Sequence, residues 1–184
     1  MMMNINEFIQ EAKRSIILAN ILPKGEHKIY QNPLFIQYSL TTITHNIKVN
    51  IVFDQDEMVI SDFFSNETYA TIDYKELTYV KVSACERIYS IPHVQQLIVL
   101  HLKTKVLDML IETKDTDYVL YLISAIHKKG IAIDDPYGIV QILLKTIKEE
   151  DGYYQYMNEH YREIAKKYDL DLPRISVYRK DAKG

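Results

Sequence analysis

The chain has 184 residues, of which 47% are apolar and 26% are charged, enough for the core of one ordinary domain plus an extension. Its formal net charge of −3 excludes a strong overall attraction to nucleic acid or to anionic lipid. Cys85 is the only cysteine, which excludes an internal disulfide and a cysteine-based zinc cluster and favours a reducing cytoplasm.

The first predicted element is an amphipathic helix over residues 4–20. Its apolar residues recur at spacings of three and four, and Pro23 and Gly25 follow as helix-ending residues. We expect this helix to pack on the main domain; the alternative is an arm that docks on a partner. The apolar positions are Ile5, Phe8, Ile9, Ala12, Ile16 and Ala19.

A series of short strand patterns follows. Residues 45–53 alternate cleanly between apolar and polar side chains, and a tight turn around Thr104 joins the last two patterns into a hairpin. Seven short strands with few long gaps favour an antiparallel barrel or sandwich over a parallel sheet. The predicted strands are 34–41, 45–53, 58–63, 68–73, 77–83, 94–103 and 106–113.

Three helices are expected after the last predicted strand. A helix from Asp115 to Lys129 has a buried stripe of Val119, Leu122 and Ile126 and a glycine stop at Gly130. A second helix is predicted to begin at residues 134–136, where two aspartates can cap it and a proline takes its first position. A third helix is predicted over residues 153–168. The predicted segments are 1–33 (helix and linker), 34–130 (β domain with its helix) and 131–184 (helical extension and basic tail).

The stretch Ile72–Val82 resembles the I-x-Y-x-x-I-x-x-V-x-V pattern of bacterial pleckstrin-homology-like (PH-like) domains and their GRAM relatives. The resemblance covers roughly 34–130. It implies an α+β fold: a PH-like antiparallel β-barrel or sandwich of about seven strands closed by one helix, here with an N-terminal helix and two C-terminal helices. Members of the family bind phosphoinositides, peptides or partner domains and rarely catalyse reactions. The chain departs from the lipid-binding pattern, because its candidate loops hold only His45 or the acidic run 54–57.

Motifs for catalysis or for metals are lacking in the sequence. The six histidines show no H-x-x-x-H spacing, and no P-loop, dinucleotide fingerprint or G-x-S-x-G elbow is present. Asp54, Asp56 and Glu57 resemble the start of a calcium loop, but the required glycine and the final glutamate are missing, which favours a hairpin turn. We interpret Cys85 as a buried small residue. The prediction is a protein that is not an enzyme and uses no cofactor.

Tyrosines in the last helix are the predicted partner-binding residues. Val140, Ile147, Tyr154, Tyr161 and Tyr168 recur every seven residues, a spacing typical of helix–helix packing. One interpretation buries this stripe against the sheet or the N-terminal helix; the other makes it an interface with a partner or with a second copy. Two further tyrosines are hard to bury beside the stripe and favour the interface. The candidates are Tyr153, Tyr154, Tyr156, Tyr161 and Tyr168.

We therefore expect a non-enzymatic intracellular protein-binding module, regulatory or inhibitory, in the cytoplasm of a low-GC bacterium or its prophage. Lysine far exceeds arginine, which suggests that source. Its partner is a protein or a second copy, bound through the C-terminal helices, and no nucleic acid is expected, because acidic residues offset the cations near the tyrosines. The alternatives are a peripheral lipid-binding domain, held weakly through the basic tail from Arg174, and an enzyme with a motif-free site.

Overall fold

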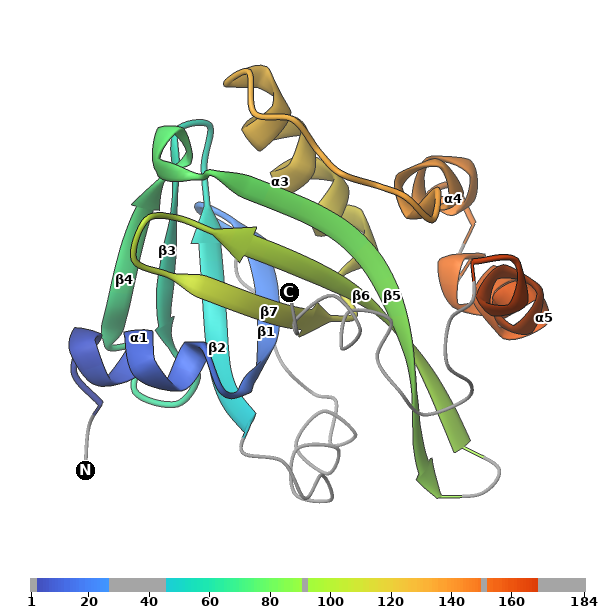
Figure 1. The fold of residues 1–184 in the computed structure, drawn as a ribbon, viewed down its shortest axis with the longest axis horizontal. Helices are drawn as coiled ribbons and strands as arrows, with labels where there is room; N and C mark the ends of the chain where they lie inside the picture. The colour runs from blue at the N-terminus through green and yellow to red at the C-terminus, as the bar shows by residue number, and fades with distance from the viewer. Residues whose placement is uncertain (1–2, 27–45, 91–92, 150–151, 169–184) are drawn as a thin grey trace.

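The structure, a computed structural model, describes residues 3–26, 46–90, 93–149 and 152–168. These residues form an α+β fold of one seven-stranded sheet and four α-helices (Figure 1). The strands are β1 (Ile16–Pro23), β2 (Asn46–Phe53), β3 (Glu57–Asp62), β4 (Thr68–Asp73), β5 (Tyr79–Ser90), β6 (His93–Lys103) and β7 (Asp108–Thr113). The helices are α1 (Ile5–Ala12), α3 (Thr116–Lys128), α4 (Ile139–Thr146) and α5 (Gly152–Lys167), with a 3-10 turn η1 (Tyr74–Glu76) after β4.

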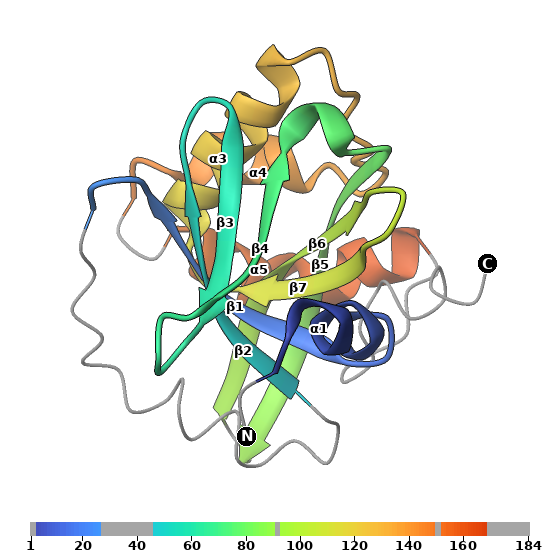
Figure 2. The same cartoon turned by 90° about the vertical axis from the view of Figure 1, so that its left-hand side faces the viewer.

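The sheet is mixed and open. Its strand order is β4-β3-β2-β1-β7-β6-β5, and β1 runs parallel to both of its neighbours while every other pairing is antiparallel. The prediction of an antiparallel barrel or sandwich is therefore wrong: over the described residues the two outer strands, β4 and β5, do not pair and the sheet does not close. Its two halves, β2–β4 and β5–β7, run in clearly different directions, as Figure 2 shows.

The predicted helix over 4–20 is also wrong in its second half. It ends at Ala12, and the chain then enters β1, the central strand. On one face of β1, Ile17 and Ile21 join the main core; on the other, Ile16 and Leu18 join a second buried cluster. A strand buried on both faces has a continuous apolar run in place of alternation, and such a run also satisfies helical spacing.

Most of the other strand predictions are confirmed. The patterns at 45–53, 58–63, 68–73, 94–103 and 106–113 correspond to β2, β3, β4, β6 and β7 within two residues at each end. β6 and β7 form the predicted hairpin, whose turn is closed by the Thr104 hydroxyl, which accepts the N–H groups of Val106 and Leu107. β5 reaches Ser90, well past the predicted end at Ser83. The predicted strand at 34–41 lies outside the described residues.

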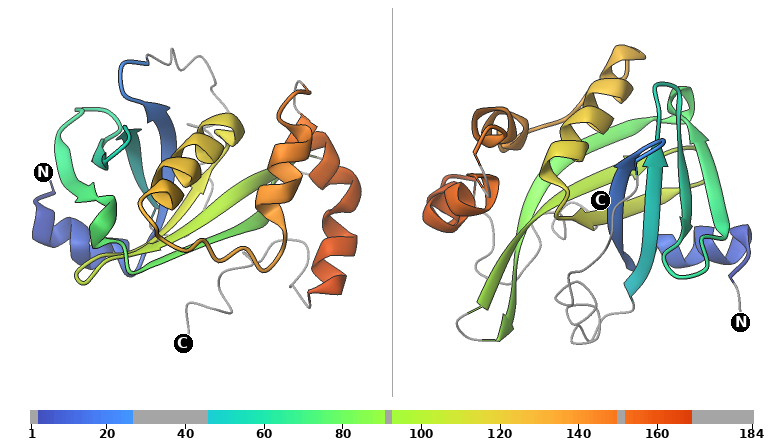
Figure 3. Two further views of the ribbon diagram at one scale, coloured as in Figure 1. Left: turned by 90° about the horizontal axis from the view of Figure 1, so that it is seen from above. Right: turned by 180° about the vertical axis from the view of Figure 1, so that it is seen from behind.

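The helices surround the sheet on several sides, as Figure 3 shows. α1 lies across one end, where the Phe8 ring stacks on Tyr69 with centroids 5.0 Å apart. α3 packs on β1, and α4 and α5 lie over β5 and β6. The helices predicted at 115–129 and 153–168 are confirmed as α3 and α5.

The start of α4 differs from the prediction. The helix begins at Ile139 and not at Pro136, because Gly138 adopts a left-handed conformation with φ of 69° just before it. Asp135 nevertheless has the predicted capping role: its carboxylate accepts the N–H groups of Ile139 and Val140 at 2.8 and 2.9 Å. One buried cluster contains residues from α1, the sheet, α3, α4 and α5, so these elements share a core.

Candidate functional site

A hollow of about 420 Å³ lies between α3, the end of β1 and the turn that joins β2 to β3. We call it the α3 hollow. Its apolar surface comes from Pro23, Phe53, Tyr121 and Ala125. Its polar rim consists of Lys24, Asp54, Gln55, Ser124, Lys128 and Lys129. Phe53 is 5% exposed and Tyr121 is 56% exposed, so the first ring belongs to the buried floor and the second stands as an accessible wall.

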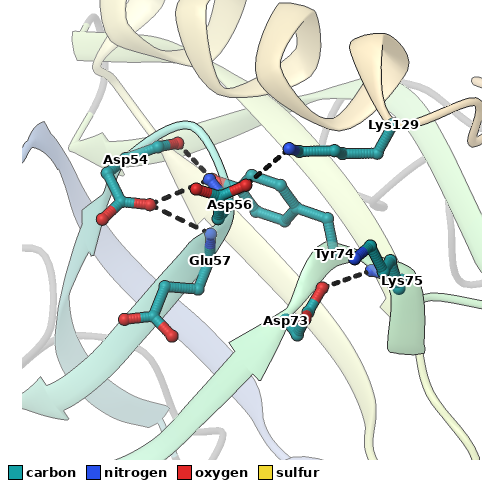
Figure 4. Close-up of polar contacts among 7 residues, drawn as sticks. All are labelled: Asp54, Asp56, Glu57, Asp73, Tyr74, Lys75 and Lys129. Carbon is teal, nitrogen blue, oxygen red and sulfur yellow. Dashed lines mark hydrogen bonds and ion pairs between the residues drawn. The ribbon is translucent and has the colours of Figure 1, made fainter.

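The β2–β3 turn on one side of the hollow is held by Asp54. One carboxylate oxygen of Asp54 accepts the N–H groups of Asp56 and Glu57 at 2.9 and 3.1 Å, and the other oxygen lies 3.1 Å from Lys24 Nζ. Figure 4 shows this turn, with α3 crossing the top of the view. The two backbone N–H groups and Lys24 lower the pKa of Asp54 below its usual value. The prediction that residues 54–57 form a hairpin turn is confirmed.

Two further contacts hold the turn in place, one from η1 and one from the end of α3. The Tyr74 hydroxyl donates to the backbone carbonyl of Asp54 at 2.9 Å, and Tyr74 is fully buried. Burial raises the pKa of Tyr74 far above 10.0. On the other side, Lys129 at the end of α3 forms an ion pair with Asp56 (Figure 4). The turn is thus tied both to the sheet and to α3, so the rim of the hollow is preformed.

A buried carboxylate fixes the other end of α3 against β1. Asp115 is 8% exposed and precedes the first residue of α3, but its side chain makes no cap hydrogen bond to that helix. Its Oδ2 accepts the N–H of Ile21 at 2.7 Å instead. β1 pairs with β7 only over Ile16–Leu18, and the N–H of Ile21 lies past the end of that pairing. Asp115 supplies the acceptor that β7 does not supply there, and thereby links the start of α3 to β1.

The predicted partner-binding tyrosines divide into buried and accessible residues. Tyr153 and Tyr161 are 3% and 1% exposed and belong to the main core. Tyr154 is 38% exposed, while Tyr156 and Tyr168 are half-buried. The interpretation that Tyr153 is hard to bury is wrong, because α5 buries every fourth residue from Tyr153 to Ala165 and not the heptad series. Burial raises the pKa of Tyr153 well above 10.0.

Other titratable groups lie on the opposite face of the sheet. His101 Nε2 lies 2.6 Å from Asp108 Oδ1, and Lys103 forms an ion pair with the other oxygen of Asp108 at 3.1 Å. Burial lowers the pKa of His101, and the contact with Asp108 partly opposes this effect. Cys85 is buried as predicted, and its thiol donates to the buried carboxylate of Glu112 at 3.4 Å. Within the part of the chain that the structure describes, no three His, Cys, Asp or Glu residues gather as metal ligands.

The sequence interpretation missed the α3 hollow. Its lining comes from three segments that lie far apart in the sequence. Tyr121 was the available signal, because it is an aromatic residue on the polar side of the predicted helix, outside the stripe that includes Val119 and Leu122. The Tyr121 ring lies 6.5 Å from the ring of Tyr118 on the same helix, centroid to centroid, and more than half of the Tyr121 surface is exposed.

Comparison with protein-family models, with curated proteins and with solved structures finds no match to the chain. Over the described residues, none of the helices combines the length and the apolar character that crossing a membrane requires.

Proposed function

We propose that this chain is a non-enzymatic protein-binding module that takes its partner at the α3 hollow. The observation that carries the proposal is the hollow itself: a preformed depression with an apolar floor, an exposed aromatic wall and a polar rim. Its volume of about 420 Å³ lies within the range of roughly 300–1,000 Å³ that is usual for ligand sites. Large apolar side chains that fill such depressions supply most of the energy of many protein interfaces.

The partner thus binds at α3 and not at the tyrosines of α5. Tyr153 and Tyr161 contribute to the core of the chain, and an interface built on them would require α5 to leave the sheet. Tyr121 has the properties that make a tyrosine suitable for an interface, namely a large contact area and a hydroxyl group at modest entropic cost. It is also more exposed than Tyr154, at 56% against 38%.

A relationship to PH-like domains, without the closed antiparallel barrel that the resemblance implied, remains part of the proposal. The order of β4 to β7 followed by α3 supports it, since the family places one helix directly after its last strand. The parallel pairing of β1 with β2 and β7 argues against it. A regulatory or inhibitory role in a bacterium or phage is the setting that we propose for the module.

The proposal is tested by filling the hollow. Ser124 is exposed on the rim, so Ser124→Trp should close the hollow and leave the fold intact; Gln141→Trp makes a similar change at an exposed position of α4. Full-length wild type and both variants are used to capture partners from a bacterial lysate, and captured proteins are identified by mass spectrometry. We expect a partner that wild type and Gln141→Trp retain and that Ser124→Trp loses. A partner retained equally by all three proteins would contradict the proposal.

A further inference from the structure

The charges around the α3 hollow do not balance. Three lysines and one aspartate line it, and Asp56 adds a second carboxylate beside the rim. Both carboxylates already have partners: Asp54 is bonded to two backbone N–H groups and to Lys24, and Asp56 is paired with Lys129. For Lys128, the described residues provide no ion-pair partner. The lysines that line the hollow therefore outnumber the carboxylates that line it.

The lysines also keep unused hydrogen-bond donors. An ammonium group has three N–H donors, and Lys24 uses one of them on Asp54 while its side chain is 68% exposed. Asp54 and, more weakly, Glu57 raise the pKa of Lys24, so Glu57 offsets part of the charge at that lysine although it does not line the hollow. A carboxylate that enters the hollow thus meets cationic donors at two positions, Lys24 and Lys128.

The apolar part of the hollow lies beside these donors. Phe53 and Pro23 form its floor and Tyr121 its wall, so one large apolar side chain could be covered there. A ligand that fits both parts combines an apolar or aromatic anchor with nearby carboxylates. Charge complementarity of this kind mainly gives specificity and a faster association, while the anchor gives affinity.

We infer that the α3 hollow binds an acidic segment of a partner protein that inserts one aromatic or large aliphatic side chain beside Tyr121 and sets its carboxylates on Lys24 and Lys128. This inference rests on the proposed function and specifies the chemistry of the partner. Acidic flanks should be preferred over neutral or basic flanks around the same anchor. The preference should weaken as salt screens the exposed charges.

The probes are three short fluorescent peptides with a central Phe flanked by Glu, by Gln or by Lys, titrated into the full-length chain and followed by anisotropy. The Glu peptide should bind best, and Lys128→Glu should weaken it about five-fold, since exposed ion pairs contribute up to about a factor of five. Lys148→Glu makes the same change of net charge at an exposed position outside the hollow and should leave binding unchanged.

The results separate this inference from the proposed function. Equal binding of the Glu and Gln peptides, abolished by Ser124→Trp, would overturn the acidic preference and leave the hollow as the binding site. Stronger binding of the Lys peptide would overturn it as well. If no peptide bound while Ser124→Trp still lost its captured partner, the inference would fail and the proposed function would stand. Failure of both tests would remove both.

Discussion

Replacing Asp115 with alanine tests how the helix that forms the hollow is held against the sheet. The substitution leaves the N–H of Ile21 without its acceptor at 2.7 Å, in a site where Asp115 is 8% exposed and Ile21 is fully buried. A hydrogen bond to a charged group contributes about 1.5–3 kcal/mol, and a buried N–H left without a partner costs about 1–3 kcal/mol. These are two measures of one loss, so we expect the free energy of unfolding to fall by about 2–3 kcal/mol.

For a chain of this length, that loss corresponds to a decrease in Tm of about 5–10 °C. Differential scanning calorimetry on wild type, Asp115→Ala and Asp115→Asn measures it, and the asparagine variant should recover part of the loss because it keeps an oxygen acceptor. Asp117→Ala is the matched control, since it removes an exposed carboxylate from the first turn of α3. Equal Tm values for Asp115→Ala and Asp117→Ala would refute the reasoning.

Three further predictions concern other parts of the structure. Tyr161→Ala should cost about 3–5 kcal/mol in urea unfolding because Tyr161 is 1% exposed, whereas Tyr154→Ala should cost far less; equal costs would contradict the buried register of α5. Tyr74→Phe should lower the free energy of unfolding by about 1 kcal/mol, because the hydrogen bond to the Asp54 carbonyl is lost. An unchanged free energy of unfolding would indicate that this hydrogen bond does not hold the turn. Burial lowers the pKa of His101 below 6.5, so the unfolded chain binds more protons and stability should fall as the pH drops from about 7 through the folded pKa. His101→Gln should flatten that slope in urea titrations at several pH values, and an unchanged slope would contradict the assignment.

The elements that the sequence predicted correctly have local signals. β2 alternates over Asn46–Phe53, the β6–β7 hairpin has its turn at Thr104, and α3 has a stripe of buried residues with Gly130 after its end. Each of these signals lies within the element that it predicts. Local patterns are therefore sufficient for the existence and the type of such elements.

β1 lacked a local signal of this kind. Its residues from Ile16 to Leu22 are buried on both faces, because α3 packs on the face that joins the main core and the other face joins the second buried cluster. Both of its pairings are parallel and connect segments far apart in the chain, so the polar alternation that identifies a half-exposed strand is missing. The error about β1 then propagated to the sheet, since a chain without this strand is compatible with an antiparallel barrel.

The site was missed for a related reason. Lys24, Asp54 and Lys128 come together only after β1, the β2–β3 turn and α3 have assembled. Each residue has an ordinary local explanation, as a turn residue or as a cation near a helix end. The tyrosines of α5 show the converse case: a heptad spacing was present in the sequence, but the packing of α5 selects Tyr153 and Tyr161 and leaves Tyr154 outside.

Site-specific photo-crosslinking tests the central claim most directly. A benzophenone amino acid is placed at Tyr121, on the wall of the α3 hollow, or at Tyr154, on the exposed side of α5, in the full-length chain. After irradiation in a bacterial lysate, adducts are resolved by gel electrophoresis and mass spectrometry. We predict a defined protein adduct from position 121 that Ser124→Trp abolishes, and none from position 154. An adduct from position 154 alone would contradict the account and return the partner surface to the C-terminal helix.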